Sequence, residues 1–148
     1  MGAALTALAR RLLAPAFVRG AALLALTSAY IAGGLAKALD LPGAAAEMAH
    51  FGLKPATAFA LAVIVLELGA PVLVLSGRLR WLGALALAGF TVLAMLLANR
   101  FWEMAGAERF AATNAFFEHL GLAGAFVLVA WHDLAGRVPA HRPDEEAP

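Results

Sequence analysis

Long apolar stretches separated by short polar connections dominate the pattern of this chain. Crossing about 30 Å of hydrocarbon takes roughly 20 consecutive apolar residues in a helix. Four stretches approach this length, and we expect transmembrane helices at residues 20–39, 56–75, 81–98 and 113–131. The third contains no charged residue, and the second contains only Glu67. The pattern therefore predicts an all-α membrane protein.

The fourth predicted helix is the least uniform. Its apolar run from Leu120 to Trp131 is too short to cross a bilayer, so the helix must extend back through His119, Glu118 and Asn114. We therefore expect these polar groups to enter the outer half of the membrane.

Short connections and small residues predict how the helices pack. The turn SGRLR, residues 76–80, makes the helices on either side antiparallel neighbours. Close approach of helices in lipid depends on small side chains. The candidates are Gly33, Gly34, Gly69, Ala70, Gly83, Gly89, Gly121, Gly124 and Ala125. We expect a compact antiparallel four-helix transmembrane domain over residues 20–132.

The N-terminal segment, residues 1–19, predicts a short helix in the membrane interface. Leu5, Leu8 and Leu12 follow helical spacing, whereas Arg10 and Arg11 lie on another face. A secretory signal peptide is the alternative, but no clear small-residue cleavage site follows the next hydrophobic run. A retained interfacial anchor is the preferred interpretation.

The outer connections and the tail complete the predicted organisation. Residues 44–51 lie between glycine and proline turns and predict one or two turns of helix, with Met48 and Phe51 dipping into the interface. Residues 99–112 form the second outer connection. The polar tail, residues 133–148, ends in HRPDEEAP, and we expect the part after Arg137 to be disordered.

Charge gives the chain an orientation, because Lys and Arg in short loops stay preferentially in the cytoplasm. One end of the predicted bundle carries Arg10, Arg11, Arg19, Arg78, Arg80, Arg137 and Arg142. The other end mixes basic with acidic residues. We expect a multi-pass protein of the inner (plasma) membrane with both termini in the cytoplasm.

Composition excludes several classes of chemistry. The chain has 63% hydrophobic residues, more than a soluble core of 148 residues can bury, and it has no cysteine for disulfides or thiolate metal sites. Haem ligation by two facing histidines is excluded, because only His119 lies inside a predicted span. No hydrolase or ATPase motif is present, and a net charge of +1 without a basic patch argues against nucleic acid. We expect no intrinsic cofactor and no metal, and a non-catalytic subunit or binding protein rather than a self-contained enzyme.

Glu67 is the main candidate for chemistry. It lies roughly 16 Å below the outer start of its helix, where an ionised carboxylate costs several kcal/mol unless it is protonated, paired or hydrated. We expect it to face the bundle interior, protonated at rest, with the hydroxyl of Tyr30 as its partner. Lys37 lies nearer the outer end and could pair with Glu67 only if the helices were offset or tilted. The alternative is a structural acid that sets helix register.

Further polar residues could line a cleft that opens outward and ends at Glu67. The predicted ligand-binding set is Lys37, Glu67, Tyr30, Asn99, Arg100, Asn114 and His119. Within it, Glu67 and Tyr30 are the candidate proton-handling residues. Snorkelling of the longer side chains to the interface is the alternative interpretation.

The order of several motifs resembles the DoxX family over residues 19–131. These motifs are GGLAK, MAHFGLKP, ELGAPVLVLSGRLRWLG, FWE and FFEHLGLAGAFVLVA. The resemblance implies a small four-helix inner-membrane protein in which Gly34, Lys37 and Glu67 match recurrent family positions. Many relatives place a histidine where this chain has Asn99, so any role of that histidine is in doubt here.

The resemblance also implies a function. The family takes its name from a membrane subunit associated with thiosulfate and quinone oxidoreduction, and other members are linked to redox stress. We therefore expect a component of a quinone-linked redox system, with quinone as a borrowed cofactor and a membrane or soluble oxidoreductase subunit as partner, in addition to the lipid bilayer. Self-association is a further open alternative. A binding or transport protein for a small lipophilic ligand and a non-catalytic scaffold for a soluble redox partner are the other two hypotheses.

Overall fold

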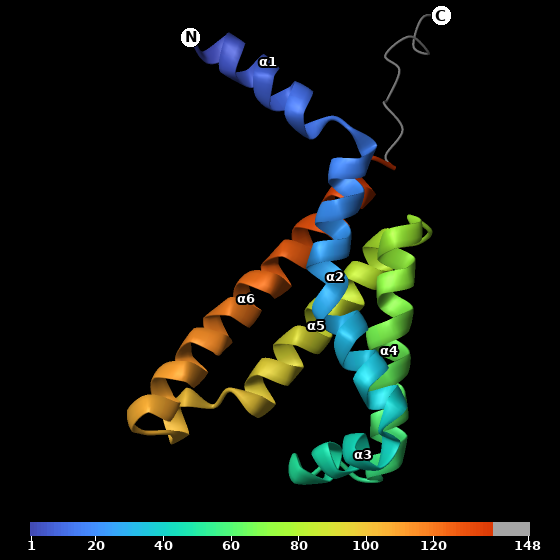
Figure 1. Ribbon diagram of the computed structural model, residues 1–148, viewed down its shortest axis with the longest axis vertical. Coiled ribbons are helices and arrows are strands. Elements are labelled where there is room, and N and C mark those ends of the chain that lie inside the picture. The colour runs from blue at the N-terminus through green and yellow to red at the C-terminus, as the bar shows by residue number, and fades with distance from the viewer. Residues whose placement is uncertain (138–148) are drawn as a thin grey trace, which may run out of the picture.

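The computed structural model describes residues 1–137, and this part of the chain is helical without strands. The elements are α1 (Gly2–Leu13), α2 (Ala16–Leu39), α3 (Leu41–His50), α4 (Ala56–Ser76), α5 (Arg80–Ala98), the 3-10 helix η1 (Phe101–Glu103) and α6 (Gly106–Ala135) (Figure 1). Four of them, α2, α4, α5 and α6, are long and apolar enough to cross a membrane. The predicted all-α membrane protein with four spans is confirmed. The predicted disorder of the tail concerns residues 138–148, which lie outside the described residues.

Two of the spanning helices are longer than their apolar stretches. Helix α2 begins at Ala16 and α6 at Gly106, several residues before the predicted starts at 20 and 113. A helix forms its backbone hydrogen bonds internally, so polar side chains outside the hydrocarbon do not end it. Pro15 does separate α1 from α2, because proline within a helix removes a backbone donor and clashes with the preceding turn.

Helix α3 is longer than the sequence pattern predicts and packs differently. The side chain of Asp40 accepts a hydrogen bond from the Gly43 backbone nitrogen at 3.0 Å, and Pro42 lies in the first turn, so the helix begins at Leu41. Met48 is buried against Ala60 of α4 instead of dipping into the membrane interface. Met48 shares a face of α3 with Ala44, and this face packs on α4 rather than on lipid.

The four long helices pack in chain order. Extensive contacts join α2 to α4, α4 to α5 and α5 to α6, but not α2 to α6. Figure 1 shows both ends of the described chain at one end of the molecule, here called the terminal end, and α3 with η1 at the other, called the α3 end. It also shows α5 and α6 leaning away from α2 and α4 toward the α3 end. The predicted compact antiparallel four-helix bundle is therefore not confirmed.

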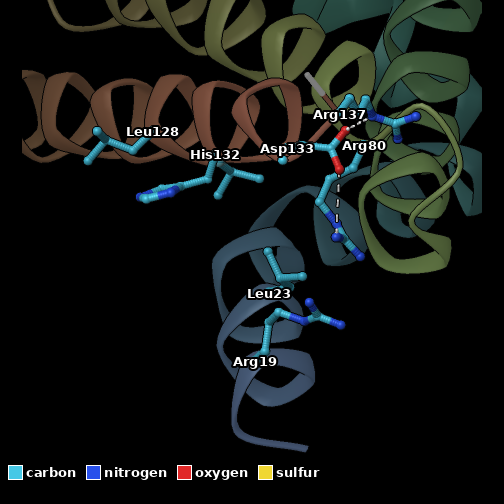
Figure 2. Close-up of a pocket in the computed structure, with 9 residues that line it drawn as sticks. Arg19, Leu23, Arg80, Leu128, His132, Asp133 and Arg137 are labelled. Atoms are coloured by element: carbon cyan, nitrogen blue, oxygen red, sulfur yellow. Dashed lines mark hydrogen bonds and ion pairs between the residues drawn. The ribbon is translucent and has the colours of Figure 1, made fainter. Parts of the chain in front are cut away.

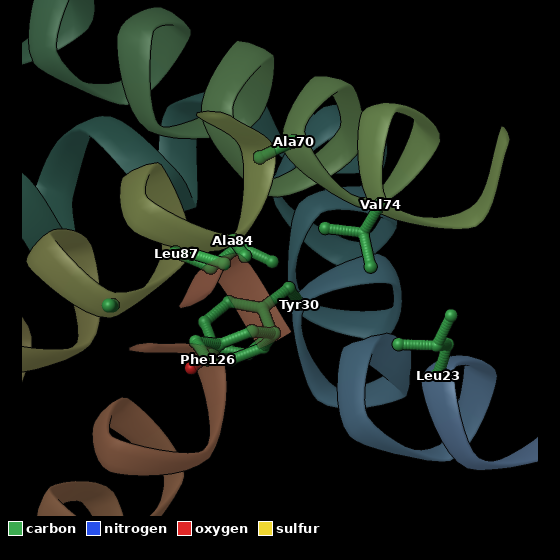
Figure 3. Packing of buried hydrophobic residues seen from close by; sticks show 9 residues of the cluster. Leu23, Tyr30, Ala70, Val74, Ala84, Leu87 and Phe126 are labelled. Carbon is green, nitrogen blue, oxygen red and sulfur yellow. The ribbon is translucent and has the colours of Figure 1, made fainter. Parts of the chain in front are cut away.

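One hydrophobic cluster joins all four long helices (Figure 3). Its members are Leu23, Tyr30, Ala70, Val74, Ala84, Leu87, Ala88, Phe126 and Ala130. The ring of Tyr30 meets Phe126 edge to face, with centroids 5.5 Å apart. This cluster is where the α2–α4 pair contacts the α5–α6 pair.

Only some of the predicted small residues bring helices together. A Cβ atom added at Gly83 would lie 2.6 Å from the carbonyl oxygen of Ala70, and one at Gly34 would lie 2.8 Å from Leu68 Cδ2. The prediction is confirmed at these contacts. It is wrong for Gly69, Gly89, Gly121 and Gly124, where an added Cβ would meet no atom of another described helix within 4 Å. A glycine permits close approach, but helix rotation decides whether it faces a neighbour.

Asp133 connects α5 and α6 at the terminal end. Its Oδ2 accepts hydrogen bonds from the Trp81 backbone nitrogen at 3.3 Å and from Arg137 Nε at 3.0 Å, and its Oδ1 lies 3.9 Å from Arg80 Nη1. The first turn of α5 leaves backbone N–H groups without helical partners, and no side chain caps it locally. Asp133 therefore caps α5 from a neighbouring helix.

Replacing Asp133 with asparagine should lower the free energy of unfolding by about 1 kcal/mol. The amide can still accept from Trp81, but it loses the charge that faces Arg80 and Arg137. Thermal unfolding in detergent measures the change. Glu103→Gln is the control, because it removes an exposed pair with Arg100 and should cost less than about 0.5 kcal/mol. Equal midpoints for the two variants would contradict the capping function.

Candidate functional site

Glu67 projects from α4 toward α2, and its side chain is almost fully buried. Both carboxylate oxygens lie 3.3 Å from the Nζ atom of Lys37. The expected hydrogen bond between Tyr30 and Glu67 is not formed. Glu67 therefore pairs with Lys37, the partner that the sequence analysis permits only if α2 and α4 are offset or tilted.

Two glycines explain why Lys37 reaches an acid deep in α4. A Cβ atom at Gly33 would lie 3.5 Å from both oxygens of Glu67, and a Cβ at Gly34 would lie 3.0 Å from Glu67 Cβ. Glu67 is thus level with Gly33 and Gly34, about one turn below Lys37. Helical side chains lean toward the N-terminus of their helix, so Lys37 extends back over this turn. The offset of α2 against α4 decides the pairing.

Helix α3 adds a third charge. Glu47 Oε2 lies 4.0 Å from Lys37 Nζ, and we call Glu47, Lys37 and Glu67 the Lys37 cluster. Side-chain exposure rises along it, from 7% at Glu67 through 18% at Lys37 to 48% at Glu47. Glu47 is absent from the predicted site. The one signal that could have indicated Glu47 is the spacing of Ala44 and Met48. When these two residues face α4, Glu47 lies on an adjacent face of α3, from which it can reach Lys37 of α2.

Tyr30 bonds to a different helix. Its hydroxyl forms a hydrogen bond with the Thr91 hydroxyl of α5, and Thr91 in turn donates to the Leu87 carbonyl at 2.6 Å. Tyr30 therefore links α2 to α5 inside the hydrophobic cluster. A proton-handling role for Tyr30 stays a prediction.

The remaining predicted site residues lie apart from the Lys37 cluster. Arg100 pairs with Glu103 at 3.3 Å, and His119 Nδ1 lies 2.6 Å from the Ala115 carbonyl of its own helix. Asn99 ends α5, and Asn114 is exposed on α6. Within residues 1–137, no hydrogen bond or ion pair joins these four to Glu67. Their part in a ligand site stays a prediction.

A hollow of about 740 Å³ opens at the terminal end, opposite the Lys37 cluster (Figure 2). Its lining residues are Arg19, Leu23, Arg80, Leu128, Val129, His132, Asp133, Gly136 and Arg137. None of these belongs to the predicted cleft. The sequence offers no direct signal for it, because α2, α5 and α6 meet there from distant parts of the chain.

The DoxX family model matches residues 20–100, more than half of the 148-residue chain. The chain belongs to the DoxX family. The match runs from α2 through α5, so the Lys37 cluster and the Tyr30–Thr91 pair lie inside the DoxX region. It ends before α6, which supplies Leu128, Val129, His132 and Asp133 to the hollow's lining. No curated protein and no solved structure matches the chain.

Proposed function

We propose that this DoxX protein is a membrane component of a quinone-linked redox system, in which the Lys37 cluster binds a polar head group and exchanges protons with it. The observation that carries the proposal is the buried Lys37–Glu67 ion pair, which continues to the exposed Glu47. An ionisable residue inside a membrane span is costly to retain, and such residues mark ligand and proton pathways.

The hydrogen-bonding capacity of the cluster fits a quinone head group. The Lys37 ammonium has three donors, and two carboxylates surround it, so the cluster can donate to a carbonyl and accept from a hydroxyl. Reduction of a quinone consumes two electrons and two protons. In this proposal an oxidoreductase partner supplies the electrons, since the chain has no cysteine for thiol redox chemistry.

The gradient of exposure supports a route for protons. Glu47 meets solvent at the α3 end, Lys37 is mostly enclosed, and Glu67 is buried. A proton that reaches Glu47 from water can pass to the interior through groups that lie within 4.0 Å of one another. Exchange of this kind requires donors and acceptors within hydrogen-bonding reach or linked by one water.

The same proposal includes an orientation. The arginine-rich terminal end faces the cytoplasm of the inner membrane, in keeping with the preference of Lys and Arg for that side. Helix α1, which buries none of its residues, lies in the interface, and the four long helices span in antiparallel order. The Lys37 cluster then faces the outer side of the membrane.

Glu67→Gln should lower quinone reduction by membranes that contain the protein about a hundredfold, because positioned acid–base groups contribute on the order of 10² to 10⁴ in rate. Quinone recovered with the purified protein should fall in parallel. Glu118→Gln is the matched control, since it removes an exposed carboxylate of α6 outside the cluster.

Other outcomes of this experiment distinguish the alternatives. Unchanged reduction and unchanged quinone recovery in Glu67→Gln would contradict the proposal. Saturable thermal protection by a lipophilic ligand, lost in Glu67→Gln without any change in quinone reduction, would indicate a binding or transport protein. A redox partner that is recovered normally with Glu67→Gln but lost when Arg78 is replaced would indicate a scaffold.

A further inference from the structure

The hollow at the terminal end is strongly cationic. Arg19 of α2, Arg80 of α5, His132 of α6 and Arg137 just after α6 line it. Figure 2 shows the Arg80 guanidinium between Asp133 and the segment of α2 that carries Arg19. Asp133 is the one carboxylate in the lining, and it is already bonded to Trp81 and Arg137.

Arg19 is available to a ligand. Its side chain forms no ion pair with any carboxylate of residues 1–137. Arg80 is held differently, since its Nε donates to the Val74 carbonyl at 2.9 Å and its Nη1 lies at the longer distance of 3.9 Å from Asp133. The hollow therefore presents more positive charge than its own acid can neutralise.

The walls of the hollow change from polar to apolar toward the membrane. Leu23, Leu128 and Val129 form its apolar side and lie on helices that span the bilayer. Trp131, directly before His132, is exposed, as is typical of the aromatic belt at head-group level. The cations thus lie where lipid phosphates lie, and the apolar walls lie where acyl chains begin.

We propose that this hollow binds the phosphate group of an anionic phospholipid, with an acyl chain along Leu23, Leu128 and Val129. The planar fork of arginine matches phosphate oxygens in pairs, and basic pockets between membrane helices bind anionic head groups. The volume of about 740 Å³ lies within the range of small-ligand sites. This site is separate from the Lys37 cluster and does not depend on the proposed redox function.

A bound lipid would also complete the packing at this end. Helices α2 and α6 share no extensive direct contact, yet both line the hollow. A head group held by Arg19 and by α6 bridges them. Because the ligand binds only the folded arrangement, it raises the free energy of unfolding with the logarithm of its free concentration once that exceeds the dissociation constant.

The experiment uses the full chain, purified in dodecyl maltoside and stripped of lipid. The probe is dioleoylphosphatidylglycerol, with dioleoylphosphatidylcholine and inorganic phosphate for comparison. The anionic lipid should raise the unfolding midpoint progressively with its concentration, and native mass spectrometry should show one retained lipid, whereas neither comparison compound acts. Arg19→Gln should weaken the apparent affinity roughly fivefold to tenfold.

Two variants test the assignment to Arg19. Arg78→Gln removes the same charge at the same end but does not line the hollow, so it should retain the affinity of the original chain. Arg19→Lys retains the charge without the fork and should give an intermediate affinity. Arg19 is exposed, so neither of its substitutions should prevent folding.

Four results would overturn the proposal. Equal responses to both lipids, or an equal loss in Arg78→Gln, would show unspecific attraction to charge or to lipid. A full response to inorganic phosphate alone would assign the hollow to a soluble anion. Lipid binding that is seen only after residues 138–148 are removed would instead assign the hollow to the acidic residues of the chain's own tail, Asp144, Glu145 and Glu146.

Discussion

Lys37→Met is expected to lower the free energy of unfolding by about 3 kcal/mol, because it leaves the buried carboxylate of Glu67 without its cation. Breaking a buried ion pair from one side costs roughly 3–5 kcal/mol. The lower end of this range applies here, since Glu67 can take up a proton and become neutral. Unfolding by sodium dodecyl sulfate in mixed micelles measures the loss.

The double variant Lys37→Met/Glu67→Gln should recover most of that stability, since neither remaining group carries a charge. Lys54→Met is the matched control: Lys54 is exposed at the same end of the molecule, and its loss should change the free energy by less than about 0.5 kcal/mol. A loss in Lys37→Met no larger than this control would show that the ion pair does not stabilise the fold.

The double variant also separates structure from function. If it folds normally yet fails to support quinone reduction, the Lys37 cluster acts in the redox reaction rather than only in helix packing. If it folds and reduces quinone normally, the ion pair is a structural device and the proposed function is wrong. The phospholipid site at the other end should respond to neither substitution.

The second large effect concerns the contact between α4 and α5. Gly83→Val should lower the free energy of unfolding by about 3 kcal/mol, which is the upper part of the range for overpacking. The first added carbon would lie 2.6 Å from the Ala70 carbonyl oxygen and 2.9 Å from Leu73 Cβ. Because a backbone atom is the obstacle, the helices must move apart, and the hydrophobic cluster around Leu87 and Val74 must loosen.

Gly89→Val is the control for this prediction. It lies on the same helix and changes helix propensity in the same way, but an added Cβ there meets no atom of another described helix within 4 Å. The two variants should therefore differ by about the full overpacking cost, measured as a difference in unfolding midpoint. Equal stabilities of Gly83→Val and Gly89→Val would contradict the close contact of Gly83 with Ala70, and would mean that α5 turns a different face toward α4.

Local features of the chain were predictable because they depend on few neighbours. The charge-free stretch 81–98 and the single acid of 56–75 indicate spanning helices whatever lies beside them. The turn at 76–80 does connect α4 directly to α5. The sequence pattern predicts a turn at Pro42 and Gly43 before the helix, but the Asp40 side chain caps the first turn and α3 begins at Leu41.

Pairing between helices was not predictable in the same way. Tyr30 and Glu67 are expected at similar depths in the membrane, which favours Tyr30 as the partner of Glu67. In the structure Tyr30 forms its hydrogen bond with Thr91, and Lys37 pairs with Glu67. The choice depends on how far α2 is shifted along α4, which the close approach at Gly33 and Gly34 decides. Glu47 enters the cluster only because α3 packs onto α4.

Hydropathy and the order of motifs are enough to indicate a four-span helical membrane protein of the DoxX family with an acid, Glu67, inside one span. Burial in lipid is a property of each segment, since a helix satisfies its own backbone and its side chains transfer to hydrocarbon independently. The Lys37–Glu67 pair, the glycines that face a neighbour and the cationic hollow became visible only in the packed helices. These depend on the relative shift and rotation of helices, to which residues far apart in the chain contribute together.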